Sequence, residues 1–455
     1  MEKLGIPTVT VVTTEFLNLA NISMKSFGAA DMAFVVVPHP MGGLSQDAIL
    51  AKANAAFQDV LKGATTWRPT VTELQTAIPL YPAERFKFKG TFSDVDKFFI
   101  EKGWADGFPI IPPTVEAVKE MLEGTDRVPN EVIGIIPTRM GAATVEVIAA
   151  NAVMSGCLPT YMPILIAAVE AIVDESFSLG GVQTTTGHHS PLLIINGPIR
   201  KQLNINYAIG ILVPGWRADA TIGRAIRLIQ NNVGGAIPGV TDMTCIGSPS
   251  RYTYVFGENE EENPWEPLHV ERGYGPSTST VTVGAAYAPQ PVCDHWGEKP
   301  EEILAIAADV MGTLSLFHGT KGYRPLVEEA LLVLVPEHAA VIAKAGWSKN
   351  DIRRFLFENA QVSLSQLKKL RRTISLPKWI DPSKEGMGDI MLPIWDKPER
   401  IVVVVAGGPG RHSAFMRSGH ANRFITKEIK LPVNWEKLLK KYKGWVAPYS
   451  KDFQP

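Results

Sequence analysis

Short runs of β-branched and other apolar residues, separated by segments long enough for helices, constrain the fold of this chain most strongly. The clearest runs occupy residues 8–12, 32–37, 191–196, 330–335 and 401–405. Near-continuous apolar runs are typical of strands that are buried on both faces of a sheet. The first two runs have a helix-length segment between them, which predicts a βαβ unit. We therefore predict an α/β fold, with a small βαβ module followed by a larger mixed α/β unit.

The length and the distribution of prolines predict how the chain is divided. At about 150 residues per domain, the 455 residues leave room for about three units. We predict a partial α/β module at residues 1–64, a linker at 65–91, a central α/β domain at 92–320, and a C-terminal α/β region at 321–455 that can complete the central domain. The first module is small for a doubly wound sheet, so we expect another part of the chain or another subunit to complete it.

Charge and hydropathy exclude several classes of partner. Lys and Arg number 45 against 46 Asp and Glu, and a net charge of −1 argues against nucleic acid as the main partner. The longest apolar stretch, near residues 163–173, is too short to cross a bilayer, and the first residues do not resemble a secretion signal. Cys157, Cys245 and Cys293 are odd in number and lack paired spacing, which argues against a disulfide framework. We expect a cytoplasmic protein without a membrane partner.

Cys157 and the pair His188 and His189 are the first candidates for catalysis. Cys157 falls between two predicted helices, at residues 144–155 and 161–174, where the second helix dipole would favour a thiolate nucleophile. The alternative is a small buried apolar side chain. His188 and His189 precede a strand and are candidates for the acid and base, with at most one facing a given site if the segment is extended. The alternative is one exposed and one structural histidine.

Three further groups of residues are weaker candidates. His269, Glu271 and Arg272 combine acid, base and cation in one loop, although an Arg–Glu network that fixes the loop would explain them equally. Cys293 and His295 are weak candidates for a metal site, because no paired Cys or His motif accompanies them. No cofactor is required by the sequence. A strand leads into Gly407, Gly408, Gly410 and His412, which would bind an anion or form a tight turn before a helix.

Two N-terminal segments, residues 5–16 (GIPTVTVVTTEF) and 35–44 (VVVPHPMGGL), resemble the later half of the UGSC family, named for its selenocysteine-Gly-Ser-Cys motif. That family is related to the selenoprotein B component of glycine reductase. The resemblance places the redox pair before the strand at residues 8–12, and residues 1–85 contain no cysteine.

From about Phe92 onward the chain resembles the larger, uncharacterised family that accompanies or is fused to this domain. The segments that carry this resemblance are residues 106–114 (DGFPIIPPT), 156–163 (GCLPTYMP), 196–198 (NGP), 264–269 (PWEPLH) and 406–412 (AGGPGRH). No settled reaction follows from it.

The missing cysteine pair leads to a functional hypothesis. A dithiol reaction needs two nearby thiols, and the three cysteines are far apart in the sequence. We therefore expect a second subunit that carries the Cys motif. The leading hypothesis is the large subunit of a thiol-dependent, hetero-oligomeric oxidoreductase or lyase, acting on a small polar substrate. Cys157 would attack, His188 or His189 would transfer protons, and Arg272 with the glycine turn would hold an anion. The alternatives are a non-redox lyase or hydratase that uses the His269 loop, and a non-catalytic scaffold.

Overall fold

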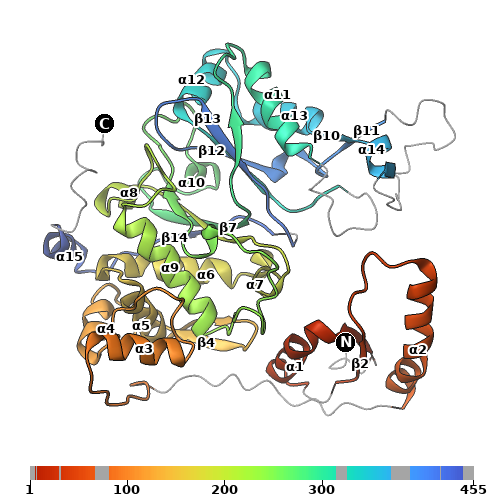
Figure 1. Ribbon diagram of the computed structural model, residues 1–455. Helices are drawn as coiled ribbons and strands as arrows, with labels where there is room; N and C mark the ends of the chain where they lie inside the picture. The colour runs from red at the N-terminus through yellow and green to blue at the C-terminus, as the bar shows by residue number, and fades with distance from the viewer. Residues whose placement is uncertain are drawn as a thin grey trace.

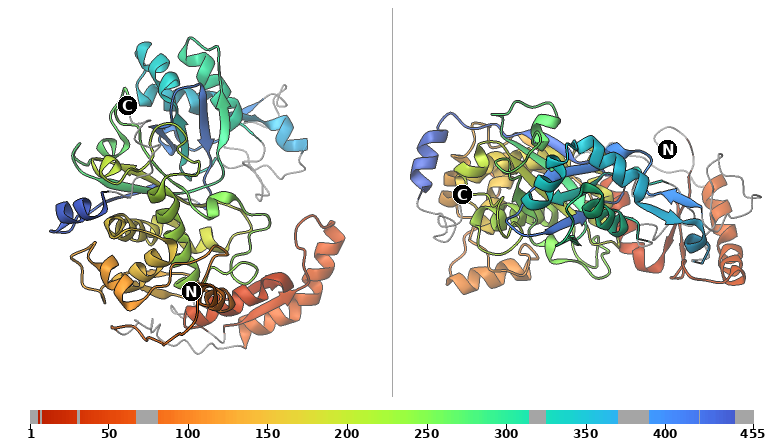
Figure 2. Two further views of the ribbon diagram at one scale, coloured as in Figure 1. Left: turned by 60° about the vertical axis from the view of Figure 1, so that its left-hand side comes forward. Right: turned by 90° about the horizontal axis from the view of Figure 1, so that it is seen from above.

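The structure is a computed structural model that describes residues 6, 8–29, 32–66, 81–313, 325–369, 390–420 and 422–443. A small N-terminal module, drawn in red, lies at one edge of a larger α/β unit (Figures 1 and 2). The predicted α/β class is confirmed. Most of the predicted linker, residues 67–80, lies outside the described residues. None of the described helices is both long and apolar enough to cross a membrane.

The N-terminal module is the predicted βαβ unit. Strand β1 (Thr10–Thr13) pairs in parallel with β2 (Phe34–Val37), and α1 (Leu17–Ser26) connects them. Helix α2 (Gln46–Thr65) follows, and the Ser45 hydroxyl caps its first turn by accepting a hydrogen bond from Ala48 N at 3.3 Å. The two strands form a sheet of their own within the part of the chain that the structure describes.

The larger unit contains two four-stranded sheets. The first has the order β14-β7-β5-β6 and the second the order β12-β9-β13-β8. Their strands are β5 (Ser190–Asn196), β6 (Val255–Gly257), β7 (Thr280–Ala286), β8 (Gln290–Cys293), β9 (Ala330–Leu334), β12 (Ile401–Val405), β13 (His412–Met416) and β14 (Ile425–Glu428).

The two sheets have the same topology and exchange their edge strands. In each sheet a parallel pair, β5 with β6 or β9 with β12, is extended by an antiparallel strand, β7 or β13. The chain then crosses over: β8, which follows β7, pairs with β13, and β14, which follows β13, pairs with β7. Strands from 92–320 and from 321–455 therefore share both sheets. The two crossover loops, just after β7 and just after β13, bring segments of both halves together.

Alternating apolar residues build a four-layered α/β/β/α core. Leu193 and Ile195 of β5 face helices on one side, whereas Leu192 and Ile194 face the second sheet. Strand β9 repeats this pattern, since Leu331 contacts the first sheet and neighbouring positions face the outer helices. Helices α5 (Val145–Ser155), α6 (Met162–Ile172) and α9 (Arg217–Asn232) cover the first sheet. Helices α11 (Pro300–Met311), α12 (Pro336–Lys344) and α13 (Lys349–Asn359) cover the second.

Helices α5 and α6 lie close to the predicted segments at residues 144–155 and 161–174. Thr114 caps α4 by accepting a hydrogen bond from Ala117 N at 3.2 Å, and Ser348 with Asp351 forms a capping box at the start of α13. The helices are α3 (Phe92–Glu101), α4 (Val115–Leu122), α5 (Val145–Ser155), α6 (Met162–Ile172), α7 (Leu179–Thr184), α8 (Ile199–Gln202), α9 (Arg217–Asn232), α10 (Leu268–Glu271), α11 (Pro300–Met311), α12 (Pro336–Lys344), α13 (Lys349–Asn359), α14 (Leu364–Lys369) and α15 (Trp435–Tyr442).

Several short strands were not predicted. Two small antiparallel pairs join β3 (Val132–Ile136) to β4 (Gly141–Thr144) and β10 (Gln361–Ser363) to β11 (Met391–Pro393). The expectation that a helix follows the glycine turn after β12 is wrong. Strand β13 follows instead, because His412–Met416 pairs with β8 on one side and β9 on the other.

Candidate functional site

A cysteine and a histidine face each other on neighbouring strands of the second sheet. Cys293 ends β8 and His412 begins β13, and the antiparallel register pairs the two residues directly. Directly paired side chains lie on the same face of a sheet, and the Cys293 Sγ is 3.0 Å from the His412 Nδ1. The ring of His295 packs edge-on against that of His412, with centroids 4.9 Å apart. The structure thus joins residues that the sequence assigned to two different sites.

An apolar pocket with a volume of about 300 Å³ opens beside His412. Its walls come from residues 209–212, from β9 and β13, and from the turn at residues 406–410. His412, Ala414 and Met416 all line it, because alternate residues of β13 share one face of the strand. A pocket of this size and lining suits a small molecule with an apolar part. The Cys293 thiol contacts the imidazole that forms its polar end.

The glycine turn between β12 and β13 forms one wall of this pocket. Gly408 is needed for close approach, since a Cβ there would lie 2.7 Å from the Ile209 Cα. Gly407 N donates to a backbone carbonyl at 2.9 Å, and Gly410 N donates to the Glu337 carboxylate at 2.7 Å. Two of the amides expected to hold an anion therefore have acceptors within the protein, and Glu337 adds negative charge at the turn.

Cys157 lies at the junction of α5 and α6, as predicted, but inside the helical core. Its Sγ is 3.3 Å from the Ser155 Oγ. Burial raises the pKa of the Cys157 thiol to about 11 and outweighs the hydrogen bonds from Ser155 and Thr221 and the charge of Arg217. At neutral pH the group is a protonated thiol. The structure therefore favours the alternative interpretation, a small buried apolar side chain. Cys245 is exposed.

His188 and His189 both contact Tyr287, which follows β7. The Tyr287 ring centroid lies 4.6 Å from that of His188 and 4.8 Å from that of His189. Both imidazoles therefore pack against the same side chain. Strand β5 begins only at Ser190, so the alternation of an extended strand does not apply to the two histidines. The ring of His420, which follows β13, lies 4.9 Å from that of His189.

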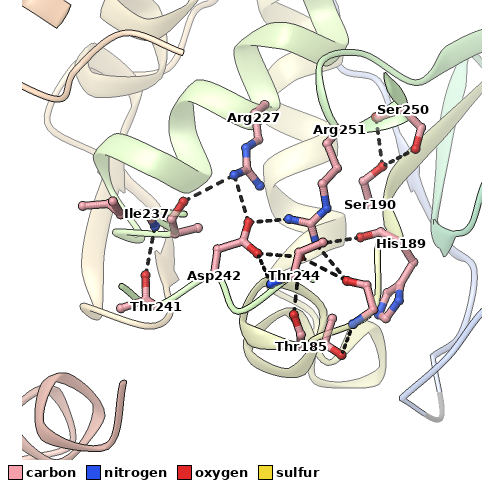
Figure 3. A network of polar contacts seen from close by, with 12 residues as sticks. Thr185, His189, Ser190, Arg227, Ile237, Thr241, Asp242, Thr244, Ser250 and Arg251 are labelled. Carbon is pink, nitrogen blue, oxygen red and sulfur yellow. Dashed lines mark hydrogen bonds and ion pairs between the residues drawn. The ribbon is translucent and has the colours of Figure 1, made fainter. Parts of the chain in front are cut away.

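Asp242 fixes the loop that carries these histidines (Figure 3). Its carboxylate pairs with Arg227 at 3.0 Å and with Arg251, and accepts a hydrogen bond from the Thr244 hydroxyl at 2.6 Å. Although burial raises the pKa of Asp242, the charge of Arg251 and these contacts hold it below its usual value. Arg251 also donates to the backbone carbonyl of His189 at 3.2 Å. The loop is therefore tied to helix α9 through a charged network.

The loop with His269, Glu271 and Arg272 is part of a separate ion network. Glu271 accepts from Lys349 at 3.0 Å and from a second cation of α13. Arg272 lies 3.4 Å from the Glu329 carboxylate, and His269 is buried. These contacts agree with the alternative that charged pairs fix a long loop.

Sequence reasoning missed the partners that give the histidines and Cys293 their surroundings. Tyr287, Arg417 and His420 belong to no motif, and only the crossover of strands between the sheets brings them to His189. The alternating pattern of residues 412–416 could have indicated part of this arrangement, because it predicts a strand with His412 and Met416 on one face. Within the described ranges, no group of three or more His, Cys, Asp or Glu side chains is arranged to hold a metal ion.

Comparison with known protein families gives one finding. Residues 1–66 match the UGSC family. The N-terminal module is a UGSC-family domain. Searches of curated proteins and of solved structures give no significant match.

The UGSC domain contributes none of the candidate residues described above. It has no cysteine, and its described parts form a sheet of two strands. Val11 and Val36 are 51% and 41% exposed on those strands, although parallel strands are normally covered on both faces. The candidate chemistry therefore lies in the larger unit, and each strand of the UGSC domain leaves one valine largely exposed.

Proposed function

We propose that this protein is a thiol-dependent enzyme in which Cys293 is the nucleophile and His412 accepts its proton. The 3.0 Å contact between the Cys293 Sγ and the His412 Nδ1 carries this proposal. A thiol within hydrogen-bond reach of an imidazole is the arrangement by which cysteine enzymes activate sulfur. All three cysteines lie in the described ranges, and Cys293 is the one with a recorded imidazole contact.

The geometry supports a definite sequence of proton transfers. As the Cys293 sulfur attacks an electrophilic carbon, its proton passes to His412. The protonated His412 then gives the proton to the departing heteroatom, so that a carbon–sulfur bond to Cys293 has replaced the carbon–heteroatom bond. Water then displaces the sulfur from the bound carbon, and the thiol regains a proton through His412. His295 packs against His412 and would keep the base oriented. The apolar pocket beside His412 would take the apolar part of the substrate, so we revise the expected substrate to a small molecule with both polar and apolar parts.

A reductase of the same kind would need a second thiol to resolve a mixed disulfide at Cys293. The chain has no cysteine close to Cys293 in sequence, and the other two are a buried and an exposed residue elsewhere. We therefore propose that a reductive reaction depends on a cysteine-bearing partner subunit. The sheet of only two described strands, with Val11 and Val36 exposed, supports a partner that completes this sheet. Three unpaired cysteines fit a reducing compartment such as the cytoplasm.

The two alternative functions have less support. A lyase that uses His269, Glu271 and Arg272 would have to draw on groups that Lys349 and Glu329 already engage. A non-catalytic scaffold would leave the close thiol–imidazole contact and the adjoining pocket unexplained.

Native-state labelling tests the proposal. The full chain is treated with a substoichiometric amount of N-ethylmaleimide or the more apolar N-benzylmaleimide, and labelled peptides are quantified by mass spectrometry. We expect Cys293 to be labelled first, with the benzyl reagent favoured by the pocket. Cys245→Ser is the matched control and should leave labelling of Cys293 unchanged. Preferential labelling of Cys157, or labelling of Cys245 ahead of Cys293, would overturn the proposal.

A further inference from the structure

A second group of polar side chains lies where the sheets exchange strands. We call it the histidine cluster: His188, His189, Tyr287, Arg417 and His420. Tyr287 follows β7 and Arg417 follows β13, which are equivalent strands of the two sheets. Tyr287 N donates to the Arg417 carbonyl at 2.9 Å, and the Arg417 guanidinium lies 4.6 Å from the centre of the Tyr287 ring. The cluster is thus built from both halves of the larger unit.

His189 is the most buried member of the cluster. Its side chain is 1% exposed, and neither ring nitrogen has a hydrogen-bond partner among the residues that the structure describes. The hydroxyl of Ser418, which follows Arg417 in the chain, is also buried without a partner in those residues. Leaving such a group unsatisfied costs about 1–3 kcal/mol, so natural proteins rarely do so without a ligand or a water to fill the need.

The surroundings of His189 are positively charged. Burial, together with His420, Arg251 and Arg417, lowers the pKa of His189 to about 3. The ring is therefore neutral at physiological pH and offers one donor and one acceptor. The nearest carboxylate in the loop network, Asp242, is already shared by two arginines. Glu328 is the other acidic group that acts on Arg417 and His420. Arg251 and Arg417 therefore both place positive charge near the His189 ring.

Backbone conformation keeps the faces of these rings close together. A Cβ at Gly187 would lie 2.5 Å from the Tyr287 Oη, and one at Gly181 would lie 3.2 Å from the His420 Nδ1. His420 itself has a left-handed conformation, with φ of 60°. A non-glycine residue in this region is under strain, and such strain is concentrated at functional sites. His420 is exposed, so the cluster extends from the surface to the buried His189.

We propose that the histidine cluster binds a small oxyanion, the carboxylate or phosphate group of a ligand. The oxyanion accepts hydrogen bonds from Arg417, from the N–H of His189 and from the Ser418 hydroxyl, and the positive charge of Arg251 and Arg417 favours it. Tyr287 holds the guanidinium plane in position, and the glycines at 181 and 187 leave room for the packed rings.

This site is distinct from the thiol site. His412 begins β13 and Arg417 follows its last residue, so the two lie at opposite ends of the strand, about 17 Å apart at 3.3 Å per residue. The oxyanion proposal can therefore be tested independently of the proposed role of Cys293. Variants at Cys293 should leave oxyanion binding unchanged.

Calorimetric titration of the full chain tests the proposal, with acetate and inorganic phosphate as separate probes at constant ionic strength. Arg417→Gln should weaken the Kd of the bound probe at least tenfold, and Ser418→Ala, a smaller change that keeps the fold, should weaken it measurably. Arg354→Gln removes an exposed arginine that pairs with Asp351 and serves as the charge-matched control. It should leave the Kd unchanged.

Each outcome decides the proposal. Binding of acetate, of phosphate or of both, lost in Arg417→Gln and kept in Arg354→Gln, supports it, and the preferred probe identifies the chemical source of the oxyanion. No binding of either probe, or equal Kd values in all variants, overturns it. If Arg417→Gln does not fold, the Ser418→Ala and His189→Gln variants provide the comparison.

Discussion

The packing of Gly187 against Tyr287 provides a sharp test of the geometry of the histidine cluster. Gly187→Ala would place a Cβ 2.5 Å from the Tyr287 Oη and 3.3 Å from the His189 Nδ1. The tyrosine hydroxyl would have to move by about 1 Å to reach an ordinary contact distance. Arg417 and the two neighbouring imidazoles confine the ring, so it cannot move freely.

We expect Gly187→Ala to cost about 1–2 kcal/mol of stability, because overpacking at about 1–3 kcal/mol exceeds the gain of about 0.4–1 kcal/mol from a stiffer unfolded chain. The matched control is Gly180→Ala in α7, where the new Cβ meets only Pro137 at 3.8 Å. The control should be neutral or stabilising by up to about 1 kcal/mol. Thermal and urea unfolding, followed by circular dichroism, measure the difference. Equal stability of the two variants, with unchanged oxyanion binding, would refute the packing described here.

Two further predictions concern Glu271 and Cys157. Glu271→Gln should destabilise the protein by about 3 kcal/mol, because it leaves Lys349, which is 5% exposed, without its carboxylate; Arg354→Gln at an exposed pair should cost about 0.5 kcal/mol. Burial raises the pKa of Glu271, but Lys349 and Arg353 outweigh burial and hold the pKa below its usual value. The ion pair therefore stabilises the fold at pH values above the pKa of Glu271 in the unfolded chain. This stabilisation is lost as the pH falls through the lower pKa of Glu271 in the folded chain. Urea unfolding at pH 7 and pH 3 should show this loss of stabilisation at the lower pH. An equal loss of stability in Glu271→Gln and Arg354→Gln would contradict the prediction. The pKa of Cys157 is about 11, against an ordinary value of 9.0 for a thiol. At pH 8 Cys157 should therefore react with iodoacetamide about 90-fold more slowly than an ordinary thiol. A rate equal to that of an exposed cysteine would show that Cys157 is not a buried, protonated thiol.

The strands and helices with strong local patterns were predictable from the sequence. The runs at residues 330–335 and 401–405 are near-continuously apolar because both faces of β9 and β12 are buried, one by the other sheet and one by helices. Helix α11 (Pro300–Met311) has a clear local start signal, since proline and two glutamates favour its first turn. Strands β6 and β8 are short and have no such pattern, so their existence depends on pairing with strands far away in the sequence.

The candidate sites were predictable only in part. Cys293, His295 and His412 were each identified, but their association depends on the register between β8 and β13, which local sequence does not determine. Cys157 was expected to be a nucleophile because of its position between two helices, but that position does not show whether the surrounding core buries the thiol. The contacts of His189 with Tyr287 and His420 could not be predicted, because they depend on the exchange of strands between two sheets.

The central claim is that His412 activates the Cys293 thiol. The most direct test is the iodoacetamide rate constant of Cys293 in the native chain at pH 7, measured by mass spectrometry for the wild type and for His412→Gln. We predict that Cys293 reacts faster than Cys245 in the wild type and that His412→Gln lowers its rate at least tenfold, with a smaller decrease in His295→Gln. An unchanged rate in His412→Gln, or a wild-type rate no higher than that of Cys245, would contradict it.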